Sequence, residues 1–223
     1  MTPQLGLFLS ALAFVGTHFL LSHPLRAPLV RALGTGPFQG IYSLVALLTL
    51  GLMIHFYGAI GREPPLWVAG DVVWLGATIL MWFGAILFVG SFVRNPALPG
   101  ARLKRGTQPT GVFAVTRHPM MAGFASWAIV HLLVVGTPKA LVLDGAILVL
   151  AVFGSVGQDS KKAKLMGERW HEWAAQTAFI PFARGFANPG AVAVIGGTLL
   201  FFVATWAHGA LGGMPAGFWR WIA

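Results

Sequence analysis

Apolar stretches separated by short polar segments dominate the pattern of this sequence. A helix that crosses the bilayer core needs about 20 predominantly apolar residues. Six stretches approach this length: Leu5–Ser22, Gln39–Ile60, Asp71–Val93, His118–Gly136, Ala140–Val156 and Ala191–His208. The segments between them carry the glycine and proline residues that end helices. The pattern predicts an all-α polytopic bundle of about six transmembrane helices, which forms one domain over residues 1–223.

Composition strengthens this prediction. The chain is 57% apolar and only 9% charged, whereas about a quarter of the residues in a soluble domain are charged. The absence of cysteine excludes disulfides, thiolate metal sites and cysteine nucleophiles. The net charge of +9 is better explained by basic loops beside anionic lipid than by nucleic acid. We therefore expect a protein that resides in a lipid bilayer.

Basic residues alternate between the two ends of the predicted bundle. Twelve of the fifteen lie in the first, third and fifth connections: Arg26, Arg31, Arg94, Arg102, Lys104, Arg105, Arg117, Lys161, Lys162, Lys164, Arg169 and Arg184. The opposite connections and the tail hold only Arg62, Lys139 and Arg220. Because cytoplasmic loops are enriched in Lys and Arg, both termini are predicted to lie outside and the three basic connections in the cytoplasm.

The longest polar segment, Gly157–Gly190, is predicted to contain a short amphipathic cytoplasmic helix. Trp170 and Trp173 alternate there with lysine, arginine and glutamate residues. This alternation is typical of a helix that lies in the membrane interface, and it favours that interpretation over a nucleic-acid site.

The sequence Thr116-Arg117-His118-Pro119 is predicted to begin the fourth transmembrane helix, because proline is well tolerated in a first helical turn. Arg117 would then lie at the lipid–water boundary, and His131 deeper in the same helix. Ionisable groups within membrane helices are functional-site hypotheses by default. The alternative is structural: His118 snorkels to the boundary, and His131 hydrogen-bonds a neighbouring helix.

Histidine is the ligand type that the predicted spans offer to a cofactor. His18, His55, His118, His131 and His208 lie within or at the ends of these spans. Neutral imidazole suits haem iron, zinc and copper. The sequence has no His-Glu-x-x-His motif, no paired carboxylates and no glycine-rich phosphate loop. Acid–base chemistry with two carboxylates is therefore not expected.

Helical depth divides these histidines into two sets. Since a helix rises about 1.5 Å per residue, His118 and His131 differ in depth by ~20 Å and cannot be the two axial ligands of one iron. His18 is level with His118, which gives an inner set. His131 is level with His55 and His208, which gives an outer set.

The sequence resembles the NnrU family, bacterial membrane proteins associated with denitrification and nitric oxide handling. The resemblance rests on segments along nearly the whole chain: His18 with Leu25-Arg26, Gly40–Val45, Pro65-Leu66-Trp67, Asn95-Pro96, Thr116–Met120, Gly123-Phe124 with Trp127, His131-Leu132-Leu133, Gly167–Trp170 and Phe179–Phe182. It implies a multi-pass protein of the bacterial inner membrane, in which the outward termini predicted from the loop charges would be periplasmic. Its role would be accessory support of nitrogen-oxide metabolism, or a redox or isomerase step on a membrane-soluble small molecule.

The zeta-carotene isomerases of plants and cyanobacteria are similar to this family and use a haem b to isomerise a cis double bond. Their proposed haem ligands match His18 and His131 here. The resemblance thus implies a haem b protein with His18 and His131 on the iron. Helical depth instead pairs His18 with His118, so all three remain candidates. Arg117 and Arg26 are the expected partners of the haem propionates, because arginine matches carboxylates.

Two other functions compete with this prediction. Arg117-His118-Pro119, Gly123 and Gly167 also resemble the isoprenylcysteine carboxyl methyltransferases, in which such segments cradle S-adenosylmethionine. The tyrosine usual two places after the proline is Met121 here, and lysines replace the usual acidic residues before Gly167. The remaining alternative is a non-catalytic membrane partner protein whose histidines are structural.

Overall fold

Helices form all the regular structure in the part of the chain that the computed structural model describes, residues 1–98, 101 and 103–222. Five of them are long and apolar enough to cross a membrane: α1 (Pro3–Ser22), α3 (Thr35–Ala59), α4 (Asp71–Gly90), α7 (Pro138–Met166) and α9 (Ala191–Ala210). α6 (Pro119–Val135) is apolar but shorter, with 17 residues. The shorter elements are α2 (Arg26–Leu33), α5 (Val112–Val115), α8 (Glu168–Gln176) and the 3-10 helix η1 (Gly217–Trp221). The predicted helical membrane bundle is confirmed.

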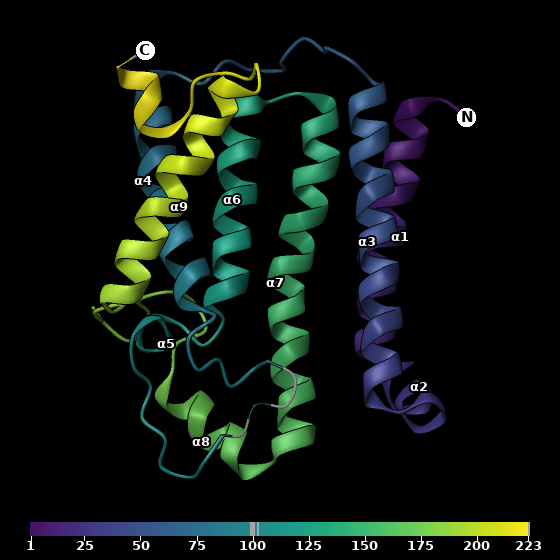
Figure 1. Cartoon of the computed structure of the whole chain (residues 1–223), viewed down its shortest axis with the longest axis vertical. Helices are drawn as coiled ribbons and strands as arrows, with labels where there is room; N and C mark the ends of the chain where they lie inside the picture. The colour runs from purple at the N-terminus through teal and green to yellow at the C-terminus, as the bar shows by residue number, and fades with distance from the viewer. Residues whose placement is uncertain (99–100, 102, 223) are drawn as a thin grey trace.

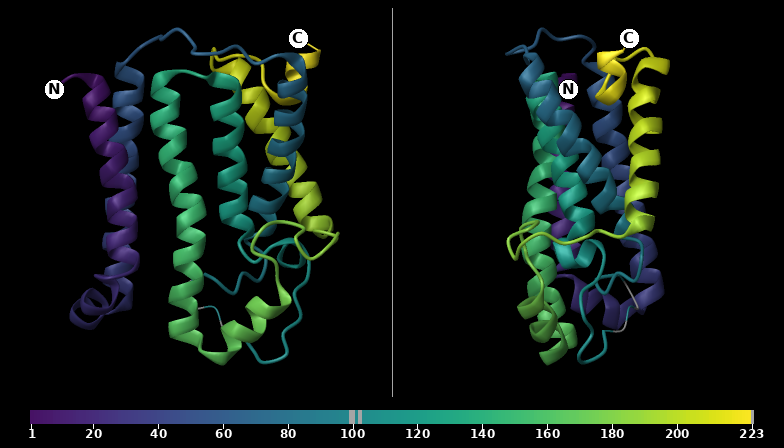
Figure 2. Two further views of the ribbon diagram at one scale, coloured as in Figure 1. Left: turned by 180° about the vertical axis from the view of Figure 1, so that it is seen from behind. Right: turned by 90° about the vertical axis from the view of Figure 1, so that its left-hand side faces the viewer.

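The long helices pack in an order that differs from their order in the sequence. α9 packs on α4, α4 on α6, α6 on α7, α7 on α1, and α1 on α3. In Figures 1 and 2 the α1–α3 hairpin stands to one side of the other four helices. An apolar cavity lies where α3 faces this four-helix group.

Local sequence explains where several helices begin and end. The hydroxyl groups of Thr2 and Thr137 cap α1 and α7, and a proline follows each of them, a favourable combination at a helix start. α7 continues through Gly157, well past the predicted end at Val156, because residues 158–166 are polar helix formers without glycine or proline. Gly167 ends it with a φ of 57°, which glycine adopts readily.

The two ends of the bundle differ in charge as expected. Figure 1 shows both termini at one end, and α2, α5 and α8 at the other. The basic connections join the helices at this second end; Arg102, which was counted among their residues, lies outside the described residues. Which end faces the cytoplasm stays a prediction.

The aromatic face of α8 is packed on protein. Trp170 and Trp173 are 2% and 4% exposed, and they form a buried cluster with Leu103, Phe113 and Val115. The prediction of a short amphipathic helix is therefore right, but the inference that these aromatic residues face the membrane interface is wrong. The connection between α4 and α6, which includes α5, supplies apolar partners that the sequence pattern left unassigned.

Candidate functional site

An apolar cavity of about 680 Å³ opens between α3, α4, α6, α7 and α9. On α6 its lining residues Gly123, Trp127, His131 and Val134 recur every three or four positions, as residues on one face of a helix do. α9 presents a similar face that ends in His208. The cavity is therefore built from the inward faces of helices that are distant in the sequence.

Four titratable side chains line the end of this cavity nearer the chain termini. Tyr57 and His208 lie near the last turns of α3 and α9, His131 lies near the end of α6, and Asp144 lies in the second turn of α7. The α6–α7 connection is at this end of the bundle (Figure 1). The cavity thus has apolar walls and one polar end.

The rings of His131 and His208 lie close together in the polar end. Their centroids are 6.1 Å apart and their planes are inclined by 33°. Nδ1 of each histidine is 2.8 Å from the carbonyl oxygen four residues earlier, on Trp127 and Ala204. Donation to these carbonyls leaves each Nε2 with a lone pair. Nε2 of neither ring has a hydrogen-bond partner among the described residues.

Asp144 is the acidic residue of this polar end. It is 3% exposed and lines the cavity, and its carboxyl group has no hydrogen-bond partner within the described part of the chain. An acidic side chain inside a membrane helix is costly and marks a functional site by default. Asp144 can form a hydrogen bond with a polar group of a bound molecule. The sequence signal for it was a single acid in an otherwise apolar stretch.

The connection between α3 and α4 holds the α6–α7 turn in place. Trp67 Nε1 donates to the carbonyl oxygen of Leu133 at 2.9 Å. The amide N–H of Leu66 donates to the carbonyl oxygen of Gly136 at 2.7 Å. Gly136 has a φ of 60°, and an added Cβ would meet the Trp67 ring at 3.0 Å. These contacts fix the turn that separates His131 from Asp144.

Arg117 and His118 lie at the opposite end of α6, where they join α7. Arg117 Nη2 and Nε lie 2.7 and 2.9 Å from Asp159 Oδ2, and Nη1 donates to the Thr177 carbonyl oxygen at 3.2 Å. His118 is 4% exposed. Its Nδ1 lies 2.9 Å from Gln158 Oε1, and its Nε2 lies 3.1 Å from Asp159 Oδ1. Both side chains thus have partners on α7, which sequence reasoning missed because Asp159 is distant along the chain.

His18 is on α1, away from the cavity. Its Nδ1 lies 2.6 Å from the Phe14 carbonyl oxygen, and its ring contacts Phe14 and Tyr42 edge-on. It is near the Ser22 end of α1, whereas His131 is near the other end of the bundle. The structure therefore does not bring His18 and His131 together. His18 and His118 share one end of the bundle, but the His118 ring faces α7.

Two other candidates lie outside the cavity. His55 is exposed on α3 beside Phe56, so of the outer set only His131 and His208 meet. Arg26 begins α2 at the basic end, together with Lys161 and Lys162. At that end burial lowers the pKa of His23, and the charges of Lys161 and Lys164 lower this pKa further.

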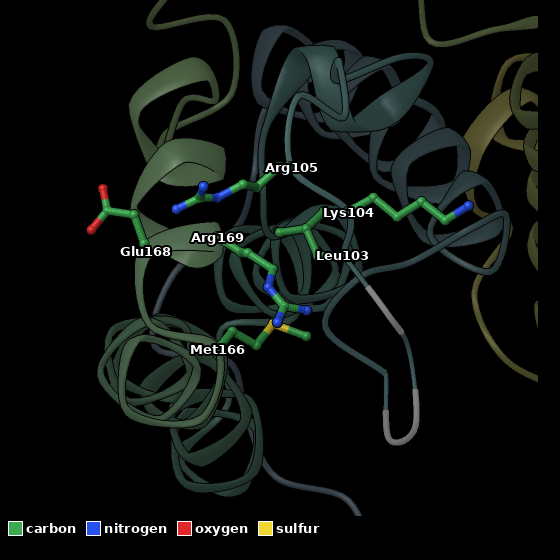
Figure 3. A pocket seen from close by; sticks show the side chains of 6 residues that line it. All are labelled: Leu103, Lys104, Arg105, Met166, Glu168 and Arg169. Carbon is green, nitrogen blue, oxygen red and sulfur yellow. The ribbon is translucent and has the colours of Figure 1, made fainter.

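A second pocket lies at the basic end of the bundle. It is lined by Leu103, Lys104, Arg105, Met166, Glu168 and Arg169. In Figure 3 Lys104 points away from Arg169, and Arg105 extends toward α8. The lining has three cations and one carboxylate, a balance that does not favour a cationic cofactor such as S-adenosylmethionine.

Comparisons with known proteins relate this chain to one family and to two plant proteins. Residues 6–216 match the family described as NnrU protein. The 15-cis-zeta-carotene isomerase, chloroplastic, of Arabidopsis thaliana is 24% identical over 192 residues, which are 83% of this chain and 51% of the relative. The protein of the same name from Zea mays is 26% identical over 151 residues, 66% of this chain and 40% of the relative.

The chain spans about half the length of the curated relatives it matches. No solved structure matches it. Neither the family match nor these relatives concern the isoprenylcysteine carboxyl methyltransferases, so that resemblance stays a prediction. Because the family match covers nearly the whole chain, this protein belongs to the NnrU family.

Proposed function

We propose that this protein is isomerase-like and binds an elongated, membrane-dissolved molecule in the apolar cavity. The observation that carries the proposal is the cavity itself, with its apolar walls and the polar end formed by Tyr57, His131, Asp144 and His208. The zeta-carotene isomerases of Arabidopsis thaliana and Zea mays are similar to this chain, and their name supports a conjugated polyene as the class of substrate.

The walls of the cavity would hold and orient such a molecule. Trp74, Phe88, Trp127 and Phe201 line it from α4, α6 and α9. Because lipid tails are as apolar as these walls, van der Waals packing would favour binding, and aromatic rings stack on flat conjugated chains in offset or edge-on arrangements. One bond of the bound chain would then lie beside His131 and Asp144, where water is displaced.

Haem b is part of the proposal, and the residues of the polar end fit it. His131 donates through Nδ1 to the Trp127 carbonyl oxygen, the arrangement that orients an imidazole for metal ligation through Nε2. The apolar walls suit a macrocycle. When bound there, haem b would supply a redox-active iron next to the conjugated chain. Arg117 and Arg26 lie at the other end of the bundle, so they do not fit as propionate partners of a haem at His131.

Filling the cavity tests the proposed site. Ala204 lines it, whereas the adjacent Val203 is 62% exposed and does not. We expect Ala204→Trp to lower the amount of 15-cis-zeta-carotene that the purified protein retains by at least fivefold, and Val203→Trp to leave it unchanged. The measurement is the absorbance of extracted pigment per protein. Equal retention by both variants would show that the pigment binds elsewhere.

Support of nitrogen-oxide metabolism in the bacterial inner membrane, which the family resemblance implies, stays a prediction. Growth of a deletion strain on nitrate without oxygen tests it directly. Normal growth and normal nitric oxide turnover of the deletion strain would contradict this prediction.

A further inference from the structure

We propose that His131 and His208 together hold the iron of haem b, one on each side. This inference rests on the proposed haem function and names a ligand, His208, that helical depth placed level with His131 but that was not among the expected haem ligands. The resemblance implies the pair His18 and His131, and helical depth favours His18 with His118. The geometry of the polar end points to a different pair.

The separation of the two rings fits two axial ligands. An imidazole nitrogen binds a transition metal at about 2 Å, and the ring centre lies about 1 Å behind that nitrogen. Two imidazoles on opposite sides of one metal therefore have centroids about 6 Å apart. The rings of His131 and His208 are 6.1 Å apart.

Both histidines are also oriented for ligation through the same nitrogen. Each Nδ1 donates to a carbonyl oxygen of its own helix, which fixes the tautomer and raises the basicity of Nε2. The Trp127 ring, 4.1 Å from the His131 ring, restrains the side chain on its helix side.

The helices that carry the two ligands have a common support. α6 and α9 both pack on α4, and Trp82 of α4 donates to Thr198 Oγ1 of α9 at 2.9 Å. The spacing of His131 and His208 is therefore set by two well-packed interfaces. His18, on α1, has no comparable connection to His131, because α1 packs mainly on α3 and α7.

Basic residues at this end of the bundle could pair with the haem propionates. The basic residues of the connections and the tail at this end are Arg62, Lys139 and Arg220. Lys139 lies over the ring of Tyr57 and Arg220 over that of Trp74, and both rings line the cavity. These cations would meet the propionates instead of Arg117 and Arg26.

Absorption and electron paramagnetic resonance spectra of the purified full-length protein test the pair. Haem is supplied during expression, and the spectra are compared for the wild type and the variants His208→Ala, His208→Met and His18→Ala. We expect a low-spin wild type, a high-spin His208→Ala variant, and a low-spin His18→Ala variant with an unchanged spectrum. Imidazole added to His208→Ala should restore the low-spin form. His208→Met should stay low-spin with a raised reduction potential, because a methionine ligand raises it.

Other results overturn the proposal in distinguishable ways. If His18→Ala becomes high-spin and His208→Ala stays low-spin, the pair implied by the family resemblance holds the iron and the haem function survives. If neither variant changes the spectrum, other residues ligate the iron. If the wild type contains no haem, the haem part of the proposed function is lost together with this pair.

Discussion

The ion pair between Arg117 and Asp159 should be the most stabilising charge contact between α6 and α7. Asp159 Oδ2 accepts from Arg117 Nε at 2.9 Å and from Nη2 at 2.7 Å, with the two side chains 15% and 23% exposed. Removal of one partner of a largely buried pair leaves the other charge unpaired and costs about 3 kcal/mol. Asp159→Asn removes the charge with little change of volume, so the loss of stability reports the Arg117 pair together with the contact of His118 to the same carboxylate.

A weak ion pair on the same side of the molecule supplies the control. Arg105 Nε lies 3.7 Å from Glu172 Oε1, with side chains 75% and 36% exposed. Exposed pairs of this kind contribute about 0–1 kcal/mol, so Glu172→Gln should be nearly neutral.

Thermal unfolding in detergent micelles, followed by tryptophan fluorescence, measures the difference. One kcal/mol shifts the Tm of a chain of this size by roughly 2–4 °C, so Asp159→Asn should lower it by about 6–12 °C. The double variant Arg117→Gln/Asp159→Asn should recover part of this loss, because no charge is left without its partner. Equal Tm values for Asp159→Asn and Glu172→Gln would refute the reasoning.

Further predictions concern the turn, a helix interface and the topology. Gly136→Ala should destabilise the protein by about 1–3 kcal/mol, because of its φ of 60° and the nearby Trp67 ring; Gly145→Ala, in open space within α7, should stabilise it by about 0.5–1 kcal/mol in the same unfolding assay. Gly197→Val should lower the yield of folded protein in size-exclusion chromatography, because its Cβ would collide with the Ile86 backbone of α4. Reporter fusions at Gly106 and Gly213 should report opposite sides of the membrane, with Gly213 outside; one common side would remove the predicted topology.

Hydropathy was sufficient to locate the long helices because a bilayer fixes their length and composition. It misplaced the end of α7, since the helix propensity of residues 158–166 carries the chain through Gly157 and beyond the apolar stretch to Met166. It also did not foresee the burial of Trp170 and Trp173, because their partners come from a connection with no periodic pattern.

The candidate site was only partly predictable. Helical depth grouped His131 with His208, and the structure brings these two rings together. Helical depth could not show that His55 points away from His131 and His208, because the depth of a residue does not determine on which side of the helix its side chain lies. The partners of Arg117 and His118 were missed, since Asp159 and Gln158 meet them only through the packing of α6 on α7.

Isomer conversion in lipid vesicles tests the central claim, that the cavity is the site of an isomerase-like reaction on a membrane-dissolved polyene. Purified haem-supplied protein and its Ala204→Trp variant are incorporated into vesicles with 15-cis-zeta-carotene, and the isomers are separated by liquid chromatography over time. We expect the wild type to convert the 15-cis isomer faster than empty vesicles do, and the Ala204→Trp variant to lose this acceleration. Conversion at the rate of empty vesicles by the wild type, or equal conversion by the wild type and the variant, would contradict the claim.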